Sequence, residues 1–213
     1  YHDRGSRDWR REQGSYMSHA RDRDHYVHAN YRFIVSPSGT YDGQASDPDM
    51  KLSWDLIMQI IASSESQSSS CPICLSEPVA PRMVKCGHVF CLSCFLRFMA
   101  STHPSEKDGK AHRGPRCQAC PICENEIYHR DAKPTRFYAG QESALPKPGD
   151  DVVLRLMARN ANSILALPSE GGAEVLNSGD GIPWHFAANV LDYARIMNAT
   201  PAYMHEQFDE EIA

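Results

Sequence analysis

Two stretches of sequence decide the fold: CPICLSEPVAPRMVKCGHVFCLSC at residues 71–94 and CQACPIC at residues 117–123. They contain all eight cysteines of the 213-residue chain. Read in order together with His88, seven of these cysteines form four close pairs of soft ligands: Cys71 with Cys74, Cys86 with His88, Cys91 with Cys94, and Cys120 with Cys123. Zinc takes four ligands in a tetrahedron, and a Cys-x-x-Cys turn presents two thiolates to one ion. The pattern predicts two zinc ions, while the spacing leaves open which pairs share an ion.

Other uses of these cysteines fit less well. A disulfide framework is disfavoured because His88 lies among the cysteines and no secretory signal precedes them. Redox-active Cys-x-x-Cys pairs need a surrounding βαβ pattern, which is missing. Independent nucleic-acid zinc fingers need paired histidines after a helix, whereas His88 lies in the tight turn CGHVFC.

Cys117 is an extra cysteine at the same spacing before Cys120. A last ligand pair made of Cys117 and Cys120 is possible, but it leaves Cys123 over and breaks the match to the first CPIC. Cys120 with Cys123 is therefore the preferred pair. A role for Cys117 as a catalytic nucleophile that forms a covalent intermediate is disfavoured, because no activating base is apparent beside it.

Composition excludes some classes of protein. The net charge of −5 includes an Arg-rich N-terminal segment and an acidic C-terminal part, so it favours no chain-wide nucleic-acid binding. No apolar run is long enough to cross a bilayer and no secretory signal is present. Cysteines in this setting favour metal binding in a reducing compartment, which indicates a cytoplasmic protein without a membrane partner.

The N-terminal flank divides into an arm, a docking segment and a linker. Residues 1–30 have few aliphatic side chains and are expected to be a flexible Arg-rich arm. Residues 31–62 predict a strand at YRFIV, a turn, and a helix with Trp54, Ile57, Met58 and Ile61 on one face. Residues 63–70 (SSESQSSS) predict a polar linker before the cysteine module at 71–123, whose insertion at 102–116 suggests a mobile loop.

The C-terminal flank predicts further docking elements. Within 124–168, DDVVLRLMARN and SILALPS read as a β-hairpin. Within 169–213, a Gly-rich loop precedes an amphipathic helix at HFAANVLDYARIM, and Thr200-Pro201 has the form of an N-cap followed by proline at the first helical position. Neither flank has a phosphate loop, a catalytic triad or a paired-carboxylate pattern.

The seven cysteines and one histidine in this order, with Pro after the first and seventh ligands and Gly87 between the third and fourth, resemble the RING finger family. The resemblance implies a small zinc-stabilised α+β fold, a cross-brace ββα module, with the arm before it and the hairpin and helices after it. It also implies interleaved structural sites: Cys71, Cys74, Cys91 and Cys94 hold the first zinc ion, and Cys86, His88, Cys120 and Cys123 hold the second.

RING proteins are ubiquitin ligases of the scaffold type, so the resemblance implies no catalytic nucleophile and no covalent ubiquitin intermediate. The partner is a conjugating enzyme charged with ubiquitin, which in the family docks in a shallow apolar groove. The matching positions are Ile73, Phe98 on the helix LSCFLRFMA, and Pro121. Many active members have Arg or Lys just after the last ligand. This chain has Glu124 there, so another cation such as Arg130 substitutes or the ligase is weak alone.

The flanks are similar to those of eukaryotic RING ligases that modify small-subunit ribosomal proteins, from about residue 31 to residue 208. The segments that carry this similarity are YRFIV, DPDMKLSWD leading into CPICL, and LRLM followed by ALP. The similarity implies a cytoplasmic ligase that docks on proteins and rRNA of the 40S subunit and acts in ribosome quality control. The alternative is a zinc-built interaction module that docks on a ribosomal or other partner without transferring ubiquitin.

Overall fold

The computed structural model describes residues 23–67, 69–101, 117–138, 147–152, 154–159, 161, 163, 165–170 and 181–213. The chain forms two compact units, each built from two separate stretches. The first unit contains the N-terminal segment to Asn30 and Ser69–Thr135, and the second contains Tyr31–Ser68 and Arg136–Ala213. The expected flexible part of the arm before residue 23 and the expected mobile insertion 102–116 lie outside the described residues.

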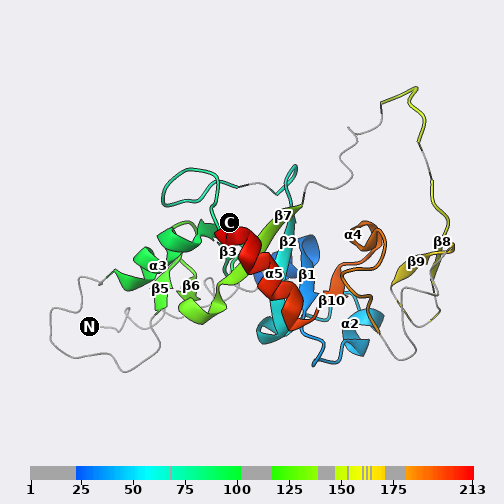
Figure 1. Ribbon diagram of the computed structural model, residues 1–213, viewed down its shortest axis with the longest axis horizontal. Helices are drawn as coiled ribbons and strands as arrows, with labels where there is room; N and C mark the ends of the chain where they lie inside the picture. Colours follow the sequence, from blue (N-terminus) through cyan, green and yellow to red (C-terminus); the bar gives the residue numbers. More distant parts are fainter. Residues whose placement is uncertain are drawn as a thin grey trace, which may run out of the picture. The chain divides into compact units, whose positions relative to one another are not determined.

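The first unit has the predicted ββα core (Figure 1). Strands β3 (Pro81–Met83) and β4 (Val89–Cys91) are antiparallel, and α3 (Leu92–Ala100) follows directly. The turn between the strands contains Gly87, whose φ of 83° is a left-handed conformation that suits a residue without a Cβ. The strand pair and its turn therefore bring the middle ligands close to the start of α3.

A second antiparallel pair in the first unit holds the last ligands. Strands β5 (Cys117–Ala119) and β6 (Glu126–Tyr128) pair so that Cys117 faces Tyr128 and Ala119 faces Glu126. The 3-10 turn η3 (His129–Asp131) then leads to β7 (Lys133–Tyr138), whose first residues pair with β3.

The apolar core of the first unit is small. Its largest members are Phe90, Phe95 and Ile127, and the ligand cysteines are buried among them. A core of this size is marginal for a domain, so metal binding is expected to supply much of the folding free energy. The fold class implied by the resemblance to RING fingers is confirmed.

Residues 23–30 are helical and belong to the first unit. The expectation of a flexible arm through residue 30 is therefore wrong for these eight residues. The segment has few aliphatic side chains, but Val27 is fully buried and His28 is 8% exposed. Tertiary contacts stabilise a helix that its composition alone does not predict.

The second unit is built on a sheet whose strands run in the order β10, β1, β2 and β7. Strand β1 (Arg32–Val35) pairs antiparallel with β2 (Ile57–Ser63) and parallel with β10 (Ile196–Asn198). Helix α2 (Asp42–Ser46) and the 3-10 turn η1 (Trp54–Leu56) lie between β1 and β2 in the chain. The predicted strand at YRFIV is confirmed.

The helix predicted within residues 31–62 is wrong, because Ile57–Ser63 is strand β2. The apolar positions satisfy a helical period, but Ile57, Ile60 and Ile61 are all buried, as are Gln59 and Ala62. A central strand buried on both faces has a nearly continuous apolar run, which periodicity does not separate from a buried helix. The β-branched isoleucines favour the strand. The linker predicted to begin at Ser63 also starts later, since Ser63 ends β2.

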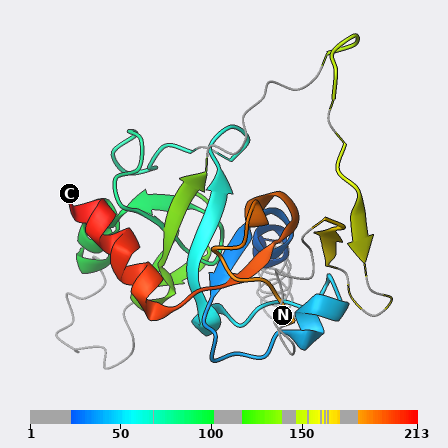
Figure 2. The same ribbon diagram turned by 45° about the vertical axis from the view of Figure 1, so that its right-hand side comes forward.

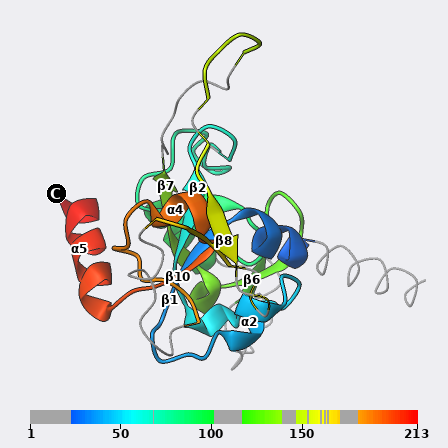
Figure 3. The ribbon, with the colours of Figure 1, turned by 90° about the vertical axis from the view of Figure 1, so that its right-hand side faces the viewer.

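The C-terminal predictions have mixed outcomes (Figures 2 and 3). The hairpin is confirmed in a shorter form, with β8 (Met157–Arg159) antiparallel to β9 (Ala166–Pro168). The amphipathic helix is confirmed only over α4 (Val190–Tyr193), because the chain then extends into β10. Helix α5 (Pro201–Ile212) begins at the predicted proline after Thr200. Of the Gly-rich loop predicted at 169–181, residues 171–180 lie outside the described residues.

Helices α4 and α5 pack on the sheet of the second unit (Figure 3). Val190 and Ala194 from the α4 region and Tyr203 and Met204 from α5 share one apolar cluster with strand residues such as Ile34. A polar contact joins α5 to the middle of β2, where the Tyr203 hydroxyl donates to Gln59 Oε1 at 2.6 Å. The second unit therefore has a core of its own without cysteine.

Candidate metal centres and docking face

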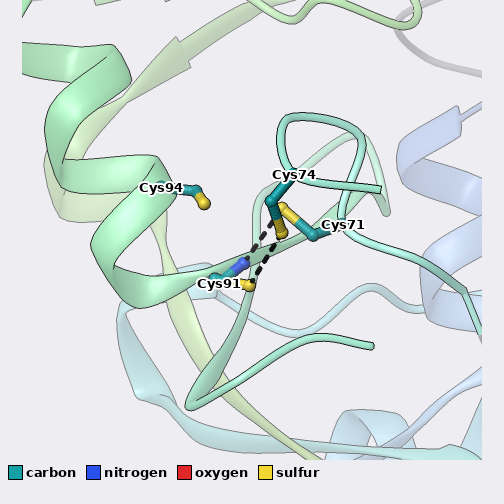
Figure 4. A group of neighbouring side chains, drawn as sticks. All are labelled: Cys71, Cys74, Cys91 and Cys94. Carbon is teal, nitrogen blue, oxygen red and sulfur yellow. Dashed lines mark hydrogen bonds between the residues drawn. The ribbon is translucent and has the colours of Figure 1, made fainter. Parts of the chain in front are cut away.

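The first candidate metal centre combines two stretches of chain (Figure 4). Cys71 and Cys74 come from the turn that starts the cysteine module, Cys91 ends β4, and Cys94 projects from α3. Their four Sγ atoms lie within 4.8 Å of one another, and Cys74 Sγ is 3.6 Å from Cys91 Sγ. Zinc–sulfur bonds in a tetrahedron place sulfur atoms about 3.8 Å apart, so the four thiols fit a zinc ion.

Backbone N–H groups also point at these sulfur atoms. Cys91 N–H donates to Cys71 Sγ at 3.4 Å, and Val79 N–H donates to Cys91 Sγ at 3.4 Å. Burial opposes ionisation of Cys71, but hydrogen bonds from the backbone of Cys74, Cys91 and Ile73 lower its pKa to about 7. The fold therefore favours a thiolate at this site, which is the form that binds metal.

The second candidate metal centre joins the β3–β4 turn to the last cysteine pair. Cys86, His88, Cys120 and Cys123 have ligand atoms within 4.8 Å of one another. His88 Nδ1 faces the three sulfur atoms at 3.3 Å from Cys86, 3.4 Å from Cys120 and 3.6 Å from Cys123. The hydrogen bond from Cys86 lowers the pKa of Cys120 to about 3 and raises that of Cys86. These three sulfur atoms and Nδ1 of His88 fit the ligand set of a zinc ion.

The pairs interleave as the family resemblance implies. The first and third pairs form one cluster, and the second and fourth form the other, so the chain can bind two zinc ions. Each cluster closes on four protein ligands, which is typical of structural zinc. Cys117 is exposed and belongs to neither cluster among the described residues.

The two CPIC turns have the same backbone. We name residues Cys71–Leu75 the first knuckle and residues Cys120–Glu124 the second knuckle. In each, the N–H of the residue after CPIC donates to the carbonyl of the first cysteine at 2.8 Å. In each, the N–H of that first cysteine donates at 2.8 Å to a carbonyl five residues on, Ser76 or Asn125. These bonds direct both thiolates of a knuckle to one side.

The three residues expected to bind a conjugating enzyme lie on three elements of the first unit. Ile73 is on the first knuckle and 41% exposed, and Pro121 is exposed on the second knuckle. Phe98 on α3 is half-buried against the core that contains the zinc ligands. Sequence reasoning missed other exposed apolar side chains in this unit: Leu75, Val79, Leu96 and Ile122. The exposure of Leu96 could have been predicted from the helical pattern, because the buried residues Phe95 and Met99 lie on a neighbouring face of α3.

Arg130, the residue suggested as a substitute cation, lies beyond the end of β6. Tyr128, two residues before Arg130, pairs with Cys117. This pair lies at one end of the β5–β6 hairpin, and the second knuckle, which ends in Glu124, lies at the other end. Its guanidinium carbon lies 5.7 Å from the centre of the Tyr128 ring. The neighbouring Asp131 is buried and pairs with Lys85 at 3.1 Å. Arg130 is thus associated with the base of the hairpin.

Comparison with known proteins agrees with the site geometry. The family model of the RING-type zinc-finger matches residues 71–118. A RING finger protein of Schizosaccharomyces pombe is 40% identical over 203 residues, covering 91% of this chain and 30% of the relative. The E3 ubiquitin-protein ligase MAG2 of Saccharomyces cerevisiae is 33% identical over 196 residues, covering 89% of this chain and 28% of the relative.

Other relatives match a smaller part of the chain. Tripartite motif-containing protein 5 of Hoolock hoolock is 30% identical over 70 residues, which is 33% of this chain and 12% of that protein. The chain spans less than a third of the length of the two yeast relatives, but their similarity covers both flanks as well as the zinc ligands. In the described part of the chain, no helix has the length and apolar character needed to cross a membrane. With its interleaved clusters and the match to the family model, the cysteine module of this chain is a RING-type zinc finger.

Proposed function

We propose that this chain is a RING-type ubiquitin ligase of the scaffold type. The observation that carries the proposal is Ile73, an exposed aliphatic side chain held on the rigid first knuckle beside a zinc cluster. Leaving a large aliphatic side chain in water at such a fixed position favours a docking role. Pro121 on the second knuckle and Phe98 on α3 complete the proposed face for a conjugating enzyme. One relative is named as an E3 ubiquitin-protein ligase, which supports the same activity.

The proposed chemistry is aminolysis of a thioester. The amine of a substrate lysine attacks the thioester carbonyl of ubiquitin, an isopeptide bond forms, and the cysteine of the conjugating enzyme leaves as a thiol with the proton from the amine. The chain contributes position: holding the reacting groups together removes much of the entropic barrier. Zinc in the closed clusters holds the knuckles in place, so no ion-bound water takes part.

We propose ribosomal proteins of the 40S subunit as substrates, in ribosome quality control in the cytoplasm. Two observations support this finer proposal. The flanks resemble those of ligases that modify small-subunit proteins, and the yeast relatives align through the same flanks. The segment before and within β8 also leaves Val152, Leu154 and Leu156 57%, 87% and 76% exposed. With Arg155 and Arg159 on alternate positions, this segment offers apolar and cationic contacts to protein and rRNA.

The alternative function is a zinc-built interaction module that docks on a partner without transferring ubiquitin. Glu124 favours this alternative, because it puts an acidic side chain where many active RING ligases have a cation. Its position on the second knuckle leaves the side chain exposed. The zinc clusters and the docking of the flanks would be the same in both cases.

Release of ubiquitin from a charged conjugating enzyme distinguishes the two functions. The assay contains the zinc-loaded chain, free lysine as acceptor, and purified 40S subunits in a parallel reaction. A ligase accelerates release over the conjugating enzyme alone, and with 40S subunits it attaches ubiquitin to their proteins. No acceleration in either reaction, with several conjugating enzymes tested, would favour the interaction module.

A further inference from the structure

The helix at residues 23–30 contacts the turn that carries two ligands of the second zinc cluster. Val27 on this helix is fully buried. A Cβ built on Gly87 would lie 2.9 Å from Val27 Cγ2, which is closer than real Cβ contacts allow. Two features therefore favour glycine at position 87: the φ of 83° and the close approach of Val27.

The contacted turn is short and has few bonds of its own. Gly87 N–H donates to the Val84 carbonyl at 2.8 Å, and Val84 N–H donates to the His88 carbonyl at 3.2 Å. Cys86 and His88 lie on either side of Gly87 and supply half of the second cluster. A side chain packed on Gly87 therefore limits how far either ligand can move from the ion.

A polar contact accompanies this packing, but it cannot be what fixes the helix. Arg23 Nη1 lies 3.4 Å from His88 Nε2. Since Nδ1 faces the sulfur atoms, a neutral ring that binds metal through Nδ1 has its proton on Nε2. Arginine has donors only, so two donors would then face each other without forming a hydrogen bond. The apolar contact of Val27 with Gly87 does not depend on the protonation of His88.

The helix itself is braced for this contact. His28 is buried next to Val27, and its Nδ1–H donates to the Asp24 carbonyl at 2.9 Å. Asn30 Nδ2 donates to the Tyr26 carbonyl at 2.8 Å. These side chain to backbone bonds join successive turns of a helix that would be too short to be stable alone.

We propose that residues 23–30 are a clamp on the second zinc cluster, with Val27 as the residue that positions Cys86 and His88 on the ion. The clamp lies far upstream of the first ligand, and the chain passes through the second unit before it returns to the cysteine module. The proposal concerns metal retention and holds whether or not the chain transfers ubiquitin. It predicts that the two ions respond differently when the clamp is weakened.

Cobalt substitution can measure the two clusters separately in one sample. The first cluster has four thiolates and the second has three thiolates and an imidazole, and the absorption of bound Co²⁺ depends on the number of sulfur ligands. The variants are made in the full chain and loaded with Co²⁺, and a chelator is then added. Val27→Ala and the shape-conserving Val27→Thr weaken the clamp, Val27→Ile keeps an aliphatic side chain, and His25→Ala changes an exposed position on the same helix.

We expect both weakening variants to lose the three-sulfur signal roughly tenfold faster than the unchanged chain, as for other substitutions next to metal ligands. The four-sulfur signal should decay at its original rate. Val27→Ile, His25→Ala and Arg23→Ala should behave like the unchanged chain. Unchanged release from the second cluster would overturn the proposal, as would equal acceleration at both clusters. Failure of Val27→Thr to fold would also count against it, because a clamp specific to one cluster leaves the rest of the unit intact.

Discussion

Leu75 and Glu124 occupy the same position in two copies of one turn. Each follows a CPIC sequence, each donates its N–H at 2.8 Å to the carbonyl of the first cysteine, and their φ angles are 62° and 61°. The backbones of the knuckles are therefore equivalent, while the side chains differ: one is aliphatic and the other acidic. Both side chains are exposed, so the difference is available to partners.

The first prediction concerns Glu124→Arg. If the proposed ligase is weak because it lacks a cation after its last ligand, this substitution should raise the rate of ubiquitin release roughly two- to tenfold by better positioning of the thioester. The measurement is single-turnover release from a charged conjugating enzyme. Leu75→Arg is the matched control, because it adds the same side chain at the equivalent backbone position of the first knuckle. A gain with Leu75→Arg, or none with Glu124→Arg, would refute the role given to Glu124.

The second prediction distinguishes Cys117 from Cys123. Since Cys117 lies outside both clusters, Cys117→Ser should retain two zinc ions per chain. Cys123→Ser removes a ligand of the second cluster, so the affinity of that cluster should fall roughly 100-fold or more, the upper range for changes beside the metal. Zinc content after dialysis against a chelator measures both. Loss of zinc with Cys117→Ser and retention with Cys123→Ser would show that the last pair is Cys117 with Cys120.

The third prediction concerns two tyrosines of the second unit. Tyr203→Phe leaves the buried Gln59 without the hydroxyl that donates to it at 2.6 Å, so the free energy of unfolding should fall by about 1–3 kcal/mol. Tyr193→Phe is the matched control, because the Tyr193 hydroxyl is buried and has no hydrogen-bond partner among the described residues. Its removal should leave stability unchanged or higher. Thermal unfolding of the zinc-loaded variants tests the pair, and equal losses would contradict it.

The fourth prediction separates ribosome docking from ubiquitin transfer. Leu154→Asp with Leu156→Asp should reduce co-sedimentation with 40S subunits severalfold, because two exposed leucines of the proposed contact surface become charged. Release of ubiquitin to free lysine should not change, since these residues belong to the other unit. Ile212→Asp at the exposed end of α5 is the control. Full co-sedimentation of the double variant would remove this surface from the proposed docking site.

The zinc ligands were predictable because metal coordination specifies ligand type, number and spacing directly in the sequence, whereas the interleaving of the pairs was implied only by the resemblance to RING fingers. The start of α5 was predictable for a local reason, a proline at the first helical position, whereas α3 was implied by the family resemblance. Strand β2 was not, because burial on both faces removes the alternation that identifies a strand. Strand β10 pairs in parallel with β1 from far along the chain, a contact that no local pattern reports. The helix at 23–30 places Val27 close to Gly87, again a contact between residues far apart in the chain, and it was missed for the same reason.

The proposed docking face can be tested with the two equivalent isoleucines of the knuckles. Ile73 and Ile122 are both the third residue of a CPIC turn and are 41% and 52% exposed. Ile73 belongs to the proposed face. The second knuckle contributes Pro121 to that face and not Ile122. The two substitutions to alanine remove the same atoms from the same kind of turn, so each controls for the other.

The most direct measurement is therefore the rate of ubiquitin release from a charged conjugating enzyme with the zinc-loaded chain, Ile73→Ala and Ile122→Ala. We predict that the unchanged chain accelerates release, that Ile73→Ala loses roughly tenfold or more of that acceleration as expected for a central docking side chain, and that Ile122→Ala retains most of it. Equal rates for Ile73→Ala and the unchanged chain, or release no faster than by the conjugating enzyme alone, would contradict a ligase that acts through this face.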